Sequence, residues 1–121
     1  MQRPRLFYVL EGHKPRVVAT VEEWGRWYEK ADRRVDFTDL GYCTVSTVFL
    51  GVDHNHFGEG PPILFETMVF GPPEGSSTTF PEEWDGRMNR YATWDEAAAG
   101  HAEMVAELRS EFWKRVNGPG A

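Results

Sequence analysis

Two apolar stretches in the middle of the chain decide the fold class: Tyr42-Cys-Thr-Val-Ser-Thr-Val-Phe-Leu-Gly-Val52 and Ile63-Leu-Phe-Glu-Thr-Met-Val-Phe70. Both are rich in Thr, Val and Phe, residues that favour β-strands. The polar, glycine-containing segment 53–60 between them is typical of a hairpin loop. Because both stretches are apolar on both faces, we expect central strands that are covered on two sides or paired in an oligomer.

Shorter β-rich runs lie on either side of these stretches. Runs 6–10 and 16–19 flank a turn that contains Gly12 and Pro15, which predicts an antiparallel hairpin. We expect this hairpin to belong to the same sheet as the two central strands. A further short strand is expected at 87–91.

Two capping boxes mark the starts of helices. Thr20 is followed by Glu23, and Thr93 by Glu96, at the spacing that lets each pair satisfy free N–H groups of a first helical turn. Apolar residues then recur on one face at the 3.6-residue period. The expected helices are 21–31, with the stripe Val21, Trp24, Trp27, Tyr28 and Ala31, and 94 to about 116, with the stripe Trp94, Ala97, Ala98, His101, Met104, Val105, Leu108 and Phe112.

These elements predict an α+β fold. An antiparallel sheet of four to five strands carries two packed helices, in the order β-β-α-β-β-β-α. The 121 residues fit a single domain, 1–121. Segment 71–86 is rich in Pro, Gly and Ser, so it is expected to be an irregular loop and the most mobile internal part of the chain.

Charge and cysteine content restrict the partners and the compartment. Thirteen basic and nineteen acidic residues give a net charge of −6, which disfavours binding to nucleic acids and to anionic membranes. The single cysteine, Cys43, cannot form an internal disulfide. No signal peptide is visible, and no run approaches the roughly 20 apolar residues of a membrane span. We therefore expect a cytoplasmic protein that does not enter a membrane.

The first candidate site is Asp53-His54-Asn55-His56, at the end of the longest predicted strand. In an extended segment His54 and His56 point the same way, so they could share a metal ion or another ligand. Asp53 would then be a third ligand or would orient a histidine. The alternative is a polar hairpin loop in which Asp and Asn stabilise turns and both imidazoles are solvated.

Glu66 and His101 form the second candidate site. Glu66 shares a strand face with Met68 and Phe70, and it would be buried if a helix packs on that face. His101, in the stripe of the second helix, would then meet it as an acid–base pair. The alternatives are an ion pair between Glu66 and an arginine, and a hydrogen-bonded core role for His101.

The surroundings of His101 add further candidates. Tyr91 and Trp94 are expected to shield the site from water. A buried imidazole needs a hydrogen-bond partner, and Asp53 or His54 are the alternatives to Glu66. Asp53 is therefore a candidate for catalysis as well as for metal binding.

Phe80 and Trp84 are aromatic residues within the irregular loop 71–86. They could form a lid or an anchor for a partner, or could fold back onto the core. The sequence contains no phosphate-binding glycine loop, zinc-protease helix, cysteine cluster or nucleophile elbow. No cofactor can be named.

Three stretches carry a resemblance: Val45-Ser-Thr-Val-Phe-Leu-Gly-Val-Asp-His54, Leu64-Phe-Glu-Thr-Met-Val-Phe-Gly71, and Arg90-Tyr-Ala-Thr-Trp-Asp-Glu-Ala97 through His101. Over most of 33–105 the chain resembles a family of small uncharacterised proteins carried by bacteriophages and prophages, notably of actinobacteria. The resemblance implies provenance and no particular activity. It also implies that segment 71–86 is longer than is usual in the family.

The favoured hypothesis is a phage or prophage accessory protein that binds a host or phage protein or a small ligand. One alternative is a small hydrolase, metal-dependent or acid–base, that uses the histidines and carboxylates of the two candidate sites. Another is a structural accessory protein of the virion. A homo-oligomer is compatible with each of these hypotheses.

Overall fold

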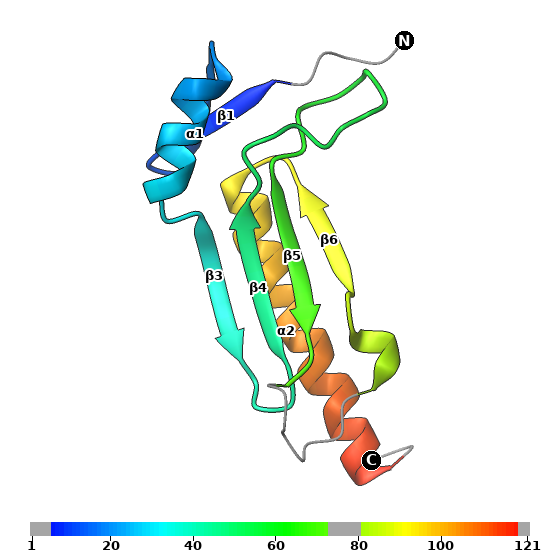
Figure 1. Ribbon diagram of the computed structural model, residues 1–121. Helices are drawn as coiled ribbons and strands as arrows, with labels where there is room; N and C mark the ends of the chain where they lie inside the picture. The colour runs from blue at the N-terminus through cyan, green and yellow to red at the C-terminus, as the bar shows by residue number, and fades with distance from the viewer. Residues whose placement is uncertain (1–5, 73–80, 119–121) are drawn as a thin grey trace.

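The computed structural model describes residues 6–72 and 81–118, which form two antiparallel sheets and two helices (Figure 1). The smaller sheet is a hairpin of β1 (Phe7–Glu11) and β2 (Lys14–Val18). The larger sheet has the order β3-β4-β5-β6, with β3 (Arg34–Asp39), β4 (Thr44–Phe49), β5 (Phe65–Phe70) and β6 (Met88–Tyr91). The helices are α1 (Val21–Lys30) and α2 (Trp94–Asn117), and a short 3-10 turn, η1 (Glu82–Trp84), precedes β6.

The α+β class is confirmed, and the predicted elements follow one another in the predicted order. One strand, β3, was not expected and lies between α1 and β4. The prediction that the N-terminal hairpin belongs to the central sheet is wrong. Among the described residues, its backbone pairing with the region beyond β4 is one bridge between Phe7 and Val52. At this bridge the Tyr8 N–H donates to the Gly51 carbonyl at 2.8 Å and the Asp53 N–H to the Leu6 carbonyl at 3.4 Å.

Both helices begin where the capping boxes placed them. The Thr20 hydroxyl accepts the N–H of Glu23 at 3.1 Å, and the Thr93 hydroxyl accepts that of Glu96 at 3.1 Å. Gly118 follows the last residue of α2 as its C-cap, and its φ of 80° lies in the region that favours glycine.

α2 covers one face of the larger sheet, and α1 packs on the hairpin (Figure 1). Burial alternates along β4 and β5, so the described residues cover one face of these strands and not both. Trp27 of α1 also reaches the larger sheet, where its ring meets that of Phe49 edge-on at 5.7 Å. In Figure 1 the opposite face of β3–β6 points toward the viewer, with α2 behind it.

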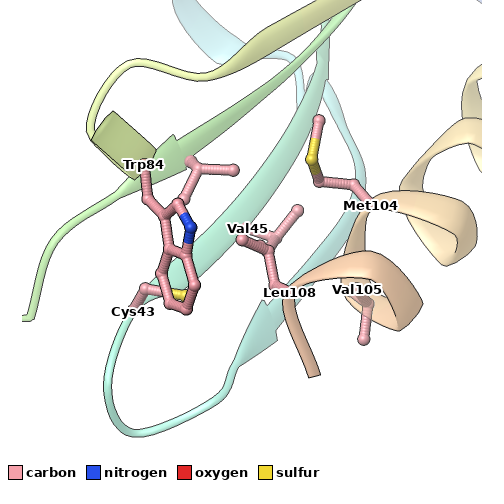
Figure 2. Packing of buried hydrophobic residues seen from close by; sticks show 7 residues of the cluster. Cys43, Val45, Trp84, Met104, Val105 and Leu108 are labelled. Atoms are coloured by element: carbon pink, nitrogen blue, oxygen red, sulfur yellow. The ribbon is translucent and has the colours of Figure 1, made fainter. Parts of the chain in front are cut away.

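The core consists of two apolar clusters between α2 and the sheet. The first joins β4 and β5 to the second half of α2, and Figure 2 shows several of its side chains. The second joins the other end of the strands to the start of α2. Their buried members are Cys43, Val45, Val69, Trp84, Met104, Val105 and Leu108 in the first cluster, and Phe49, Leu64, Phe65 and Ala97 in the second.

α2 approaches β6 closely at Gly100. A Cβ atom placed on Gly100 would lie closer than 3.0 Å to atoms of the Tyr91 ring, a separation that real Cβ atoms essentially never show. Glycine is therefore required here by the proximity of the ring rather than by its backbone angles.

Candidate functional site

His101 is buried between the two apolar clusters, where it is 2% exposed. Its Nδ1 lies 2.7 Å from the Thr47 hydroxyl and its Nε2 2.8 Å from the Thr38 hydroxyl. The Thr47 hydroxyl in turn lies 2.6 Å from that of Thr67. We call these four residues the polar row. One imidazole N–H and three hydroxyl protons provide a donor for each of the three contacts, so a neutral histidine satisfies the row.

Strand alternation places the polar row between the two clusters. Thr47 pairs with Thr67 across β4 and β5, and both point toward α2. His101 lies about one helical turn from buried residues on either side of it in α2. The row therefore forms a single polar layer across an otherwise apolar interface.

Burial determines the charge state of His101. Removing the imidazolium from water lowers the pKa of His101, and the Asp36 carboxylate raises it only in part. Asp36 Oδ2 lies 3.8 Å from His101 Nε2, but its side chain is 56% exposed and well solvated. The imidazole is thus held neutral inside the core, which suits a structural hydrogen-bond role.

The expected burial of His101 is confirmed, but its expected partners are wrong. Its hydrogen bonds go to threonines rather than to Glu66, Asp53 or His54. Glu66 alternates with Thr67 along β5 and so points to the face opposite α2, where the Arg90 Nε donates to its carboxylate at 2.9 Å. Glu66 therefore forms an ion pair with an arginine, which was the alternative expectation, and the expected acid–base pair of Glu66 and His101 does not form.

The segment that links β4 to β5 is held by two of its own side chains. Asp53 is 4% exposed, and its Oδ1 accepts the N–H groups of Asn55 at 2.8 Å and Ile63 at 3.0 Å. The Asn55 amide donates to the carbonyls of Glu59 at 2.7 Å and Pro61 at 3.0 Å. Its Oδ1 accepts the backbone N–H of residue 57 at 3.1 Å. Asp53 and Asn55 thus fix both ends and the turn of the loop.

The two loop histidines line a small pocket beside Asp53. The pocket has a volume of about 220 Å³ and is lined by Val52, Asp53, His54 and His56. The His54 Nδ1 donates to the Val52 carbonyl at 2.7 Å, and the imidazole centres of His54 and His56 lie 6.3 Å apart. Within residues 6–72 and 81–118, no three His, Cys, Asp or Glu side chains are grouped so that they could hold a metal ion. A metal at this loop therefore stays a prediction.

Phe57, at the tip of this loop, was not identified from the sequence. It is 89% exposed, the highest value among the exposed large hydrophobic residues of the described chain. We call residues 53–62 the Phe57 loop. The sequence feature that could have indicated its exposure is an aromatic residue followed by Gly58 inside a polar segment. Patterns for strands and for metal ligands do not detect such a residue.

Three of the aromatic candidates, Trp84, Tyr91 and Trp94, have packing roles. Trp84 is 1% exposed and belongs to the first cluster, so of its two alternatives it folds back onto the core and does not anchor a partner (Figure 2). Trp94 stacks on His13 at 3.7 Å, and both Trp94 and Tyr91 pack against the second cluster. The Tyr91 hydroxyl is buried without a hydrogen-bond partner among the described residues. Phe80 lies outside the described residues, as does 73–80 of the expected mobile loop.

A wide, shallow hollow of about 630 Å³ lies beside Arg87 and α2. Arg87 would be the group that attracts an anion there. However, its guanidinium donates to both carboxylate oxygens of Glu111, at 2.6 and 3.2 Å. This pair lowers the pKa of Glu111 and raises the pKa of Arg87, so both stay charged and neutralise each other.

Neither α1 nor α2 combines the length and the apolar character that crossing a membrane requires, and no other helix in the described ranges does so. Comparison with protein-family models, with curated proteins and with solved structures found no match. The resemblance to phage and prophage proteins therefore stays a prediction from the sequence.

Proposed function

We propose that the protein acts by binding another protein through the Phe57 loop. The observation that carries this proposal is the 89% exposure of Phe57 on a loop whose backbone is fixed by buried side chains. Burying an exposed phenylalanine contributes about 1.5–3 kcal/mol, which favours contact with an apolar partner surface.

The order of the loop strengthens this argument. Binding costs free energy when a mobile segment has to be immobilised. Here Asp53 and Asn55 already hold the backbone on both sides of Phe57 through hydrogen bonds to main-chain groups. The loop therefore loses little conformational entropy on binding, and its aromatic tip is presented in one orientation.

The size of the adjacent pocket favours a protein over a small molecule. Pockets for small ligands usually have volumes of about 300–1,000 Å³. The pocket between His54 and His56 has about 220 Å³, below that range. These histidines fit better as a polar rim around an aromatic anchor, an arrangement that is common in protein interfaces.

The nature of the partner follows from charge and from the sequence resemblance. The net charge of −6 disfavours nucleic acids and anionic membranes. The resemblance makes a host or phage protein the expected partner, met in the cytoplasm of the host cell if the gene belongs to a phage. A hydrolase has less support, because Glu66 and His101 lie on opposite sides of the sheet and His101 is enclosed in the core.

Site-specific photocrosslinking tests the proposal. A photoreactive amino acid replaces Phe57 in one variant and Trp113 in the matched control, since Trp113 is also exposed, at 52%, but lies on α2. In cells that naturally carry the gene, position 57 should crosslink one protein that position 113 does not. With that protein purified, Phe57→Ala should weaken binding by about ten- to a hundredfold, and Trp113→Ala should not. Equal crosslinking from both positions, or unchanged affinity of Phe57→Ala, would contradict the proposal.

A further inference from the structure

The larger sheet has a second face that the described residues leave open. Register places three cross-strand rows on it, because residues paired across neighbouring strands share a face. The middle row is largely apolar, and Phe37 and Met88, at its two ends, are 42% and 41% exposed. The rows are Arg34, Val48, Glu66 and Arg90; Phe37, Ser46, Met68 and Met88; and Asp39, Thr44 and Phe70.

The charges at the two ends of β3 are opposite. Arg34 and Asp39 lie on this face opposite Val48 and Thr44, and β3 contains a register shift between Arg34 and Asp36. The two rows are therefore four β4 residues apart, roughly 13 Å, which is too far for an ion pair within one chain. Within the described ranges neither side chain forms an ion pair. The Arg34 guanidinium lies over the Phe37 ring at 4.6 Å, and Asp39 accepts the Gly41 N–H at 2.8 Å, which keeps both groups at the face.

We propose that this face binds a second copy of the chain, as a symmetric dimer of stacked sheets. A twofold axis that runs between the two sheets, parallel to the middle row and perpendicular to the strands, places the middle row of one copy against the middle row of the other. The same axis brings Arg34 of each copy to Asp39 of the other. Both ion pairs form together, because a twofold interface is self-complementary.

The remaining groups fit this arrangement. Glu66 and Arg90 form a neutral pair on the open face, so neither brings an unpaired charge to the contact. The partly exposed Phe70, in the third row, meets the row that contains this pair. Stacked sheets lie about 10 Å apart with strands within roughly 30° of each other, which preserves the correspondence of the rows near the axis.

The size of the face sets the strength of the dimer. Three strands of six residues and one of four cover roughly 360 Å² in projection, whereas a stable interface buries about 800 Å² on each partner. The contact is therefore at the weak end, and we expect dissociation at low micromolar protein concentration and dimers at higher concentration.

A charge-swap experiment tests the proposal by sedimentation equilibrium at protein concentrations from micromolar to millimolar. Arg34→Asp and Asp39→Arg each place like charges together at both ends of the interface. Each variant alone should dimerise about tenfold more weakly than the unchanged chain. An equimolar mixture of the two should recover dimers, because each mixed dimer contains two opposite-charge pairs again. Recovery also shows that both variants are folded.

The matched control is Arg109→Asp, which makes the same charge change at an exposed position of α2. It should dimerise like the unchanged chain. A monomer at all concentrations would overturn the proposal. Dimerisation that is unaffected by the single variants, or a mixture that stays monomeric, would also overturn it. The Phe57 loop is unchanged in every variant, so these outcomes are independent of binding to another protein.

Discussion

Gly100→Ala tests the close approach of α2 to β6. Gly100 lies in the middle of a buried helix face, and a methyl group there would overlap with Cζ, Oη and Cε1 of Tyr91. The ring cannot simply swing away, since Tyr91 packs against the second cluster and its hydroxyl is buried. Relief requires α2 to move off the sheet or the ring to leave its site.

Two opposing effects set the size of the change. Replacing glycine by alanine inside a helix stabilises by about 0.5–1 kcal/mol. Overpacking a core costs about 1–3 kcal/mol, and an overlap with several ring atoms belongs at the upper end. We expect Gly100→Ala to lower the free energy of unfolding by about 2 kcal/mol, which corresponds to a melting temperature lower by roughly 8 °C for a domain of this size.

Gly25→Ala is the matched control in α1. A Cβ atom on Gly25 would have no neighbour within 4 Å, so only the helix propensity should change. This variant should be more stable than the unchanged chain by about 0.5–1 kcal/mol. Urea denaturation followed by circular dichroism measures both variants. The double variant Gly100→Ala/Tyr91→Leu should recover part of the loss, because leucine lacks the three overlapping atoms.

The contradicting result would be a Gly100→Ala variant that is as stable as Gly25→Ala. That result would mean that α2 does not lie against Tyr91 as described. A loss in Gly100→Ala that persists undiminished in the double variant would assign the loss to another cause than the ring.

Three further predictions concern the titrating groups of the core and the surface. Because the folded pKa of His101 lies below the unfolded value of about 6.5, the unfolded state binds the extra proton, and stability should fall as pH drops below about 6.5. Urea unfolding at neutral and mildly acidic pH should show this loss of unfolding free energy, and the loss should be smaller in His101→Gln by the part that His101 causes. An identical pH response in both proteins would contradict the burial of the imidazole. Cys43 is fully buried, and its pKa is raised to about 11, mainly by desolvation and further by the Asp39 carboxylate. A thiol reagent should therefore modify Cys43 only after unfolding. Rapid stoichiometric labelling of the native protein would contradict the burial of this thiol. A double-mutant cycle of Arg87→Met and Glu111→Gln should give a coupling free energy of unfolding below about 1 kcal/mol at neutral pH. This coupling should disappear in acid, when Glu111, whose pKa is lowered, becomes protonated. A coupling that persists at low pH would argue against an ionic origin.

Local sequence signals were sufficient for the helices and for the central hairpin. The threonine caps fixed the helix starts because the hydrogen bonds they make are local. β3 was missed, since Arg34-Val-Asp-Phe-Thr-Asp39 is mostly polar and follows a helix end without a turn signal. As an edge strand with one open face it needs few apolar residues, so its pattern is weak.

The candidate site depended on which face of β5 meets α2, and periodicity does not decide this. Glu66 shares its face with apolar residues, as Thr67 does, so either face was a reasonable partner for a helix. Packing of Phe65 and Val69 against α2 decides it and turns Glu66 away. Hydrogen bonds between His101 and threonines 54 and 63 positions away are likewise invisible to local patterns.

The polar row also limits how α2 can sit along the sheet. Apolar side chains alone would let α2 slide along the sheet, because each apolar contact that is lost is replaced by another of similar free energy. Displacing α2 by one turn, about 5.4 Å, would carry the imidazole away from the Thr47 and Thr38 hydroxyls and into aliphatic surroundings. His101 would then lose both of its hydrogen bonds and Thr38 its bond to the imidazole, while the Thr47–Thr67 contact between β4 and β5 would remain. Only one axial position of the helix satisfies these groups. The row therefore fixes the position of α2 along the sheet. The His101→Leu variant should retain its helices, but residues of α2 should give more than one amide NMR resonance each, because the helix occupies more than one position.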